Sequence, residues 1–485
     1  MDITNLKPEI VWKFFHQVTQ VPRPSKKEGK IIRYLESFAK EYNVALKKDK
    51  VGNILMSKPA TPGYEKLPTV ILQSHMDMVC EKNSDKVFDF DNDPIQTVVD
   101  GGWLRADGTT LGADNGIGLA AELAILASTD IEHGPIECLF TVDEETGLTG
   151  ANALEAGFMT GEILLNLDSE DEGELFIGCA GGKDTQGTFY YDRIPAPVDL
   201  QYFRIDIKGL KGGHSGGDIH KRLGNANKIL ARFLYLLKKK FDFALCCIDG
   251  GNLRNAIARE AYAIIGLKPG DKEEVRAMLN RFTSNIEVEL KYADPDVQII
   301  MQSADKPEMC IESGMAEKLI YAIHACPHGV KAMSHDIEGL VETSTNLASV
   351  KMKDGDKIVI GTSQRSSIEW SKEEIANQVS CVFLLAGAEV TQGDGYPGWA
   401  PNPDSQILKV AAGSYKKLFN KEPKVMAIHA GLECGLFLEK YPYLDMISFG
   451  PTLRDVHSPN ERIQTDTVEL WWKHLLDLLK SIPAK

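Results

Sequence analysis

The chain has 485 residues, more than one hydrophobic core usually supports, so we expect at least two domains. Hydrophobic residues make up 43% and charged residues 25%, which is ordinary for a soluble globular protein and argues against extensive disorder. The formal charge of −15, with no dense basic stripe, disfavours nucleic acid and anionic membrane as partners.

The cysteines and the first residues indicate a cellular compartment. Nine cysteines, an odd number with no CxxC pair, argue against a disulfide framework. Residues 1–15 lack a basic segment followed by an apolar one, and no apolar run reaches the ~18 residues that span a bilayer. We therefore expect a cytoplasmic protein.

In chain order, the outer parts of the sequence alternate between helical and strand-like patterns. An amphipathic helix is predicted over 8–20, and a second runs to about residue 42 after the turn Pro22-Arg23-Pro24-Ser25. Buried strands are predicted at 70–72, 136–142, 163–167 and 446–449, and further helices at 115–128, 151–157, 405–419 and 466–480. This alternation predicts a layered α/β domain.

The middle of the chain has a different pattern and no cluster of acidic residues suited to catalysis. Strands are predicted at 202–207, 261–267, 285–290 and 357–362, between helices at 224–240, 272–283, 314–325 and 372–387. We expect an α/β domain split into residues 1–187 and 385–485, with an α+β domain inserted at 188–384. The sequence shows no internal repeat.

Each of the four predicted strands of the split domain is closely followed by a residue able to bind a metal. These residues are His75, Glu145, Asp168 and His457. In open α/β sheets, ligands bind in the crevice beyond the carboxyl ends of the strands. The four side chains are therefore expected to meet there.

Each of these residues also has an ordinary structural explanation. His75 could be a buried histidine with satisfied hydrogen bonds, but Asp77, two residues on, could fix its tautomer as metal-bound imidazoles require. Asp114 precedes a helical run and could simply be an N-cap, although its two carboxylate oxygens could also bridge two cations.

The acidic residues after the other two strands have alternatives of the same kind. Glu144 and Glu145 could form a solvated turn, but in extended backbone they would point to opposite sides, one binding a metal and the other taking a proton from water. Asp168 opens an acidic run that otherwise resembles a solvated loop, and only this first member directly follows the strand.

Two histidines and three carboxylates suit zinc, with cobalt and manganese as alternatives. Two such ions ~3.5–4 Å apart would acidify a bridging water and polarise a carbonyl group. The pattern therefore predicts hydrolysis without selecting the substrate.

At these residues the chain resembles the zinc aminopeptidase/carboxypeptidase group that includes carnosinases and aminoacylases. The matching segments extend from residue 74 to residue 461, nearly the whole chain, and their order and spacing are highly specific. They are Ser74 to Val79, Leu111 to Gly118, Phe140 to Gly150, Asn166 to Asp168, Lys211 to Gly216, His429 to Gly435 and Asp455 to Glu461.

The resemblance implies a role for each residue of the centre. Asp114 would bridge two metals, and Glu144 would be the general base. His75 and Asp168 would complete one metal's ligands and Glu145 and His457 the other's, while Asp77 would orient His75.

The resemblance also implies that the inserted domain is a lid. His214 would stabilise the oxyanion. Asn255 and Arg365 would bind the substrate carboxylate, although an ordinary surface arginine is an equal explanation for Arg365. Glu433 lies in a matching segment, but no role is assigned to it.

The activity implied is a metal-dependent dipeptidase that hydrolyses Xaa-His and other dipeptides with a metal-activated bridging water. An N-acyl amino acid amidohydrolase or a tripeptidase would use the same centre, and a non-catalytic metal-binding scaffold is a third alternative. Relatives are often homodimers, but the sequence carries no self-association pattern of its own, so the oligomeric state stays open.

Overall fold

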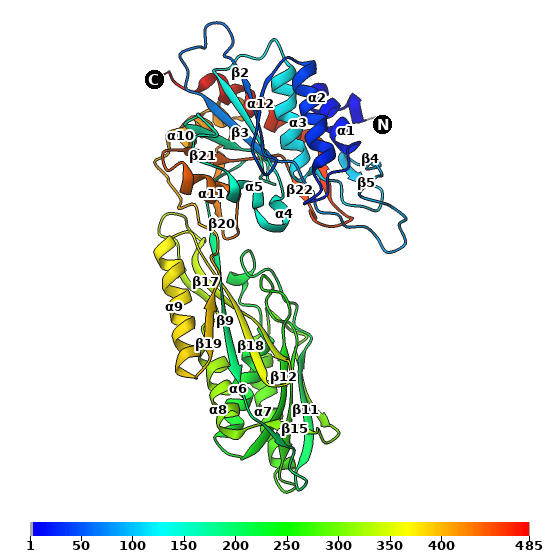
Figure 1. The fold of residues 1–485 in the computed structure, drawn as a ribbon, viewed down its shortest axis with the longest axis vertical. Coiled ribbons are helices and arrows are strands. Elements are labelled where there is room, and N and C mark those ends of the chain that lie inside the picture. The colour runs from blue at the N-terminus through cyan, green and yellow to red at the C-terminus, as the bar shows by residue number, and fades with distance from the viewer. Residues whose placement is uncertain (1–2, 485) are drawn as a thin grey trace. The chain divides into compact units, whose positions relative to one another are not determined.

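The structure is a computed structural model that describes residues 3–484. The chain divides into two compact units. The first contains the residues up to 179, then 399–427, then those from 432 onward, and the second contains 180–398 and 428–431 (Figure 1).

The first unit is built on an eight-stranded sheet with the order β1-β2-β6-β3-β7-β21-β8-β20. Its central strands β6, β3, β7 and β21 are parallel. Every residue of β3 and β6 is buried, as expected of parallel strands covered on both faces. The strands are β1 (Ala45–Lys48), β2 (Ile54–Lys58), β3 (Val70–His75), β6 (Ile136–Thr141), β7 (Ile163–Asn166), β8 (Glu174–Cys179), β20 (Lys424–Ile428) and β21 (Asp445–Ser448).

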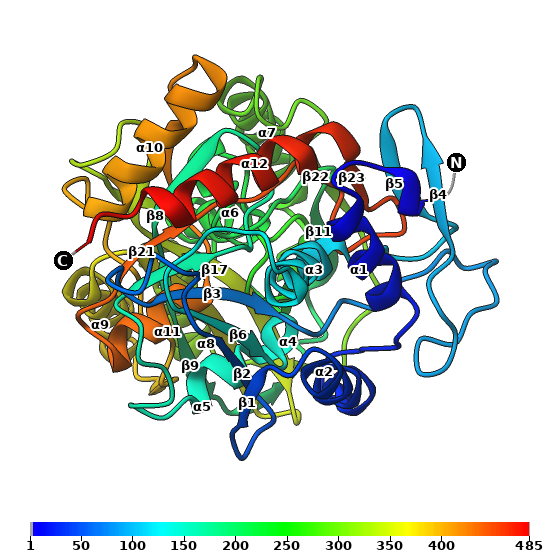
Figure 2. The same cartoon turned by 90° about the horizontal axis from the view of Figure 1, so that it is seen from above.

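Helices cover both faces of this sheet. In Figure 2, α3, α10 and α12 lie on one side of β3, and α5 and α11 lie on the other. Helix α3 is buried nearly all round, which explains its run of alanine and leucine. The helices are α1 (Glu9–Thr19), α2 (Gly29–Glu41), α3 (Ala113–Ala127), α4 (Glu144–Gly147), α5 (Thr149–Ala153), α10 (Gln406–Phe419), α11 (Glu433–Lys440) and α12 (Thr465–Ser481).

A small antiparallel sheet completes the first unit, with the order β22-β23-β5-β4. It pairs a segment near residue 100 with the segment that follows β21. The strands are β4 (Thr97–Asp100), β5 (Trp103–Ala106), β22 (Leu453–Arg454) and β23 (Arg462–Gln464).

The second unit consists of two β-α-β-β-α-β modules, one inserted into the other. The inner module is β11 (Gln201–Lys208), α6 (Ala226–Lys238), β12 (Phe243–Gly250), β13 (Ala261–Leu267), α7 (Lys272–Glu289) and β14 (Gln298–Ser303). The outer module is β9 (Gly181–Tyr190), α8 (Ser313–Ala325), β17 (Val341–Lys353), β18 (Lys357–Ser366), α9 (Glu369–Leu385) and β19 (Glu389–Gln392).

Both modules have the same strand order. Counted within each module it is 4-1-3-2, which is the ferredoxin-like arrangement. The two sheets join where Gly250 of β12 pairs with Val350 of β17, and α6, α7, α8 and α9 contribute to a single apolar core. The two modules therefore repeat the same topology, although the amino-acid sequence shows no internal repeat.

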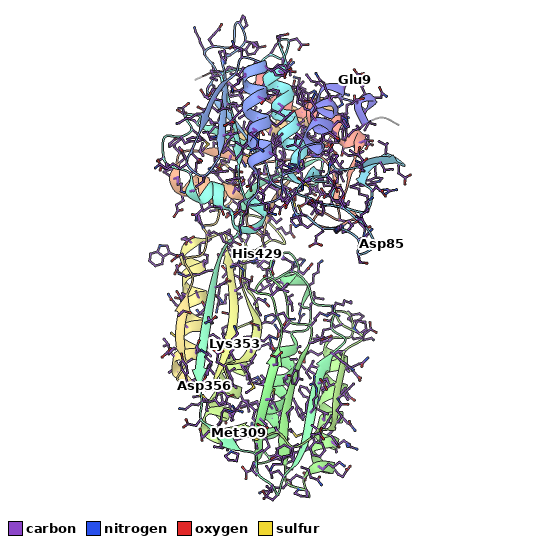
Figure 3. The ribbon with its side chains drawn as sticks, turned by 45° about the vertical axis from the view of Figure 1, so that its right-hand side comes forward. Glu9, Asp85, Met309, Lys353, Asp356 and His429 are labelled. Carbon is purple, nitrogen blue, oxygen red and sulfur yellow. A yellow bond between two sulfur atoms is a disulfide. The ribbon has the colours of Figure 1, made fainter. Side chains whose placement is uncertain are left out.

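Two smaller features belong to the second unit. β16 (Gly329–Met333) pairs with β17, and β10 (Arg193–Pro195) pairs with β15 (Met309–Ile311), whose first residue is labelled in Figure 3. Cys246 and Cys310 form a disulfide, and the other seven cysteines are free. The sequence predicted no such bond, because its two partners are 64 residues apart and carry no local spacing signal.

Most of the predicted elements are confirmed, but one is wrong. Residues 285–290 are predicted as a strand, yet residues 285–289 form the end of α7 and Leu290 is its C-cap. Ile286 and Leu290 continue the helical spacing of Leu279 and Phe282 and are buried, whereas Val288 is 77% exposed.

The division between the units differs from the predicted boundaries after residues 187 and 384. It falls after residues 179 and 398 instead. Strands β9 and β19 pair with each other, which places residues 181–190 and 389–392 in the second unit. Residues 428–431 join them because the N–H of Ala180 donates to the carbonyls of Ile428 and Ala430.

No helix within residues 3–484 combines the length and apolarity that a membrane span requires.

Candidate metal centre

Four potential metal ligands lie at the carboxyl edge of the parallel strands in the first unit. His75 is the last residue of β3, and Asp168 follows β7. Glu145 lies in α4, shortly after β6, and His457 lies in the loop between β22 and β23, downstream of β21. Because these strands are parallel neighbours, their carboxyl ends share one edge of the sheet.

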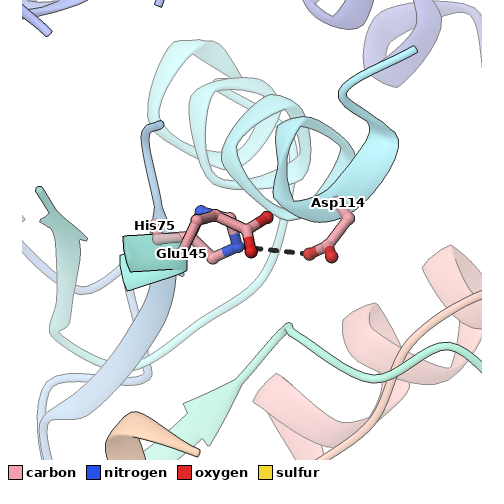
Figure 4. A group of neighbouring side chains, drawn as sticks. All are labelled: His75, Asp114 and Glu145. Atoms are coloured by element: carbon pink, nitrogen blue, oxygen red, sulfur yellow. Dashed lines mark hydrogen bonds and ion pairs between the residues drawn. The ribbon is translucent and has the colours of Figure 1, made fainter. Parts of the chain in front are cut away.

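Asp114 lies between the two histidines, with one carboxylate oxygen toward each. Its Oδ1 is 3.2 Å from Nε2 of His75 (Figure 4). Its Oδ2 is 3.0 Å from Nε2 of His457. Asp168 Oδ1 is 3.5 Å from the same His75 nitrogen, and Glu145 Oε2 is 3.0 Å from the same His457 nitrogen. The structure thus brings together two groups of potential ligand atoms that share Asp114.

The residues at this centre fit divalent cations. His75, Asp114 and Glu145 each offer an atom within 4.8 Å of the others. Oε1 of Glu145 is buried and has no hydrogen-bond partner among the described residues. Burying an unpaired carboxylate oxygen is costly unless a cation or donor meets it. Imidazole nitrogen and carboxylate oxygen are zinc's common ligands after thiolate.

The charges of the centre shift the pKa values of its members strongly. Burial lowers the pKa of His75, but the surrounding carboxylates, Asp168 foremost, outweigh burial and raise it well above its usual value. Hydrogen bonds to Asp114 and Glu145 raise the pKa of His457 to about 11. Burial raises the pKa of Asp114, yet its bonds to the two histidines hold it well below the ordinary value. These side chains form one electrostatically coupled group.

Asp77 connects His75 to the start of α4. Its Oδ1 is 3.4 Å from Nδ1 of His75, and its oxygens accept the backbone N–H groups of Glu144 and Glu145 at 3.1 and 3.3 Å. The hydroxyl of Ser25 donates to it at 2.7 Å. Asp77 therefore anchors the start of α4 and lies against the His75 imidazole.

Glu144 and Glu145 do not lie in extended backbone, as the sequence interpretation assumed. Asp143 has a left-handed φ of 49°, which ends the strand direction, and Glu144 begins the one-turn helix α4. Their side chains diverge because successive helical residues differ by about 100° around the axis. Burial, followed by nearby carboxylates, raises the pKa of Glu144 well above its ordinary value.

Asp114 is not the N-cap of α3. The capping position is Gly112, and Asp114 itself has non-helical backbone angles. Asn115 provides a local bond instead, because its side-chain oxygen accepts the N–H of Gly118 at 3.1 Å. The same side chain donates to Asp168 Oδ1 at 2.6 Å.

Two residues without a predicted role hold the segment that carries Asp114. The buried carboxylate of Glu461 accepts the backbone N–H groups of all four residues from 111 to 114, at 2.7 to 3.3 Å. The buried guanidinium of Arg23 donates to the carbonyls of Met76, Asp77 and Gly112. The turn Pro22-Arg23-Pro24 gives no local sign that the Arg23 side chain is buried. Glu461 could have been noticed, because it is the last residue of one of the matching segments.

Glu433 is fully buried behind the centre. Its Oε2 accepts hydrogen bonds from Gln73 at 2.6 Å and Thr141 at 2.8 Å, which lie on β3 and β6. Burial raises its pKa to about 8. Glu433 therefore connects α11 to β3 and β6.

His214, in the second unit, is held in one tautomer. Its Nδ1 accepts the backbone N–H groups of Gly216 and Gly217 at 3.2 and 3.1 Å. Burial, with Arg365 nearby, lowers its pKa, which favours the neutral ring. A neutral imidazole whose Nδ1 accepts carries its proton on Nε2, so Nε2 is a hydrogen-bond donor.

Arg365 and Asn255 lie in the same unit as His214. Arg365 is buried rather than on the surface and donates to the hydroxyl of Tyr396 at 2.9 Å. The backbone carbonyl of Asn255 accepts the N–H of Ser215 at 2.8 Å, next to His214. His429, labelled in Figure 3, bonds through Nε2 to Ser344 at 2.7 Å, and burial, then Arg365, lowers its pKa to about 3.

Comparison with known proteins gives matches over the whole chain. Residues 71–481 match the family described as peptidase family M20/M25/M40. The chain is 41% identical over 484 residues to the cytosol non-specific dipeptidase of Escherichia coli (strain K12), covering 100% of both.

Solved structures agree with this match. The crystal structure of aminoacylhistidine dipeptidase from Vibrio alginolyticus has a TM-score of 0.92 at 43% identity, over 100% of this chain and 99% of that one. A tripeptidase from Staphylococcus aureus has a TM-score of 0.58 at 17% identity, over 98% and 99%, and shares the fold. The chain is therefore a peptidase that belongs to family M20/M25/M40.

Proposed function

We propose that the chain is a metal-dependent dipeptidase of the cytosol, acting on Xaa-His and other dipeptides. The observation that carries the proposal is the position of Asp114, whose two oxygens face two separate groups of ligand atoms. The names of its full-length relatives from Escherichia coli and Vibrio alginolyticus support the substrate class, and the first also supports the location.

In this proposal two divalent cations, zinc or alternatively cobalt or manganese, would be held by His75, Asp168, Glu145 and His457, with Asp114 shared. Such a pair lowers the pKa of a water and polarises the carbonyl group of the substrate. Asp77 would keep Nε2 of His75 directed at the centre, because its carboxylate lies 3.4 Å from the opposite ring nitrogen.

Glu144 is the proposed general base. It is adjacent to the ligand Glu145, and its backbone N–H is fixed by Asp77. Its carboxylate would take a proton from the attacking water and then give that proton to the amine that leaves when the peptide C–N bond breaks. Burial supports this role, because a desolvated carboxylate is a stronger base than one in water.

His214, Asn255 and Arg365 are the proposed substrate-binding residues. The Nε2 proton of His214 suits a donor to the oxygen that becomes negative during attack. The guanidinium of Arg365 has a buried Nε without a hydrogen-bond partner among residues 3–484, so it retains a donor for a substrate carboxylate.

Hydrolysis of a small substrate panel tests the proposal. The panel holds Ala-His, β-Ala-His, Leu-Gly, a tripeptide and an N-acetyl amino acid, each incubated with chelated protein and again after zinc, manganese or cobalt is restored. We expect metal-restored cleavage of the dipeptides. Cleavage confined to the tripeptide or the acetylated substrate would keep the centre and refute the substrate class, and no cleavage by metal-loaded protein would favour a scaffold.

A further inference from the structure

The second unit contains a cavity of about 760 Å³ whose lining includes none of the proposed metal-binding or substrate-binding residues. It lies among α6, the ends of α7 and α8, and the segments around residues 219–225 and 328–339. Its volume is within the range of natural small-molecule sites. His214, Asn255 and Arg365 are not among its lining residues.

One part of the cavity wall is apolar. Ile229 comes from α6, Ile286 comes from α7 and Leu290 directly follows it, and Ile257 comes from the loop before β13. These four residues are at most 8% exposed. A wall of this kind favours a ligand with a hydrocarbon or aromatic body.

The charged groups in the lining are mainly cationic, in a chain whose net charge is −15. Arg222 is exposed, and no carboxylate within residues 3–484 forms an ion pair with it. Glu289 is the only carboxylate among the described lining residues, and it is paired with Arg232 at 2.7 Å. The guanidinium of Arg222 therefore has its charge available for an anion.

Lys228 adds positive potential without offering a free donor. Its Nζ donates to the carbonyls of Ile323, His324 and Cys326, at 3.0, 2.6 and 2.6 Å, where α8 ends. An ammonium group has three protons, so all of them are used. Lys228 thus fixes one side of the cavity while Arg222 stays free to contact a ligand.

Two of the lining histidines, His324 and His328, add polar groups. Nδ1 of His328 accepts the N–H of Leu347 at 3.3 Å, so the neutral ring has its proton on Nε2. Burial lowers the pKa of His328 to about 4, which keeps the ring neutral. Nδ1 of His324 is buried and lacks a hydrogen-bond partner among the described residues.

We propose that this cavity is a binding site for a small carboxylate with an apolar body, such as a medium-chain acyl or an aryl carboxylate. The apolar wall would hold the body, and the fork of Arg222 would pair with the carboxylate. A cationic ligand would be repelled by Arg222 and Lys228. The site would be independent of the dipeptidase centre.

Isothermal titration calorimetry of the full-length protein with octanoate tests the proposal. Octanol, octylammonium and acetate serve as probes that lack the charge, invert it or lack the apolar body. We expect octanoate to bind more tightly than all three, whether or not the protein has been treated with chelator. Equal binding of octanol or acetate, or loss of octanoate binding on chelation, would overturn the proposal, and the last result would place the carboxylate on the metals.

Three variants locate the binding. Arg222→Asn removes the charge and tolerates the left-handed φ of 58° at this position, and it should weaken octanoate binding roughly 10- to 100-fold. Val330→Asp adds a negative charge at a lining residue that is 39% exposed, and it should weaken binding comparably. Arg276→Gln removes an exposed charge of α7 outside the lining and should change nothing. Unaltered affinity in both cavity variants would refute the site.

Discussion

The role of an individual side chain in the centre is indicated by the residues that it contacts in the folded protein. An aspartate before a helix, alone, is best interpreted as an N-cap. Here the cap is Gly112, and the carboxylate of Asp114 faces two histidines from distant segments. Local sequence could not separate these alternatives, because both place an aspartate at the same position.

Replacing Glu144 by glutamine tests the proposed base. The amide keeps the shape of the side chain but cannot take a proton, so we expect turnover to fall by about 10²- to 10⁴-fold while metal content stays unchanged. Dipeptide hydrolysis and metal analysis of the same sample measure both quantities. Glu41→Gln, at the exposed end of α2, is the matched control and should keep full activity. Normal turnover in Glu144→Gln would show that Glu144 is not the general base.

His429 predicts a dependence of stability on pH. Its folded pKa is about 3, against roughly 6.5 when unfolded, so between these values the unfolded chain binds more protons. Stability contributed by the neutral ring is present above about pH 6.5 and is lost as the pH falls below it.

We therefore expect the free energy of unfolding to drop by about 2 kcal/mol more in the wild type than in His429→Asn between pH 7 and pH 5. Asparagine retains a group that can bond to Ser344 but does not titrate. Urea unfolding of both proteins at the two pH values measures the difference. Equal drops would show that His429 is not the titrating group.

At the scale of elements, the carboxyl ends of β3, β6, β7 and β21 account for the position of the centre. The apolar runs and the residues that follow them predicted this edge, since parallel strands share one direction. Apolar periodicity gave the wrong prediction at residues 285–290, because a segment of six residues fits both the strand period of two and the helical period of 3.6. Only continuity with Leu279 and Phe282 on one helical face distinguishes the helix.

Alanine substitutions at this end of α7 test that helical face. In a strand, Ile286 and Val288 would share one face, whereas in the helix only Ile286 points to the core. We expect Ile286→Ala to destabilise the protein by about 2–5 kcal/mol and Val288→Ala by no more than about 0.5 kcal/mol. Chemical denaturation gives both values, and similar losses would contradict the helix.

At the scale of the whole molecule, the second unit has a core of its own. Its two modules combine through β12 and β17 and bury one apolar cluster. The chain enters and leaves it at neighbouring positions, because Gly182 pairs with Tyr396. Such an insertion, with adjacent ends, suits independent folding.

Residues 180–398 expressed alone should therefore fold. We expect cooperative thermal unfolding by circular dichroism and no dipeptide hydrolysis, since every proposed metal ligand lies in the first unit. A variant of the fragment with Phe383→Asp, which places a charge in the core, is the unfolded control. A fragment without a transition would show that the unit depends on the rest of the chain.

The sequence by itself determined the parallel strands, the residues that follow them and the order of the matching segments, because strand periodicity and strand-end chemistry are local properties. Tertiary structure decided the rest. The burial of Arg23, the bonds that Glu461 makes to residues 111–114, the paired modules and the cationic cavity all depend on contacts between distant segments. Such contacts produce no pattern along the sequence, because the two partners of each contact are far apart in the chain and meet only in the folded protein.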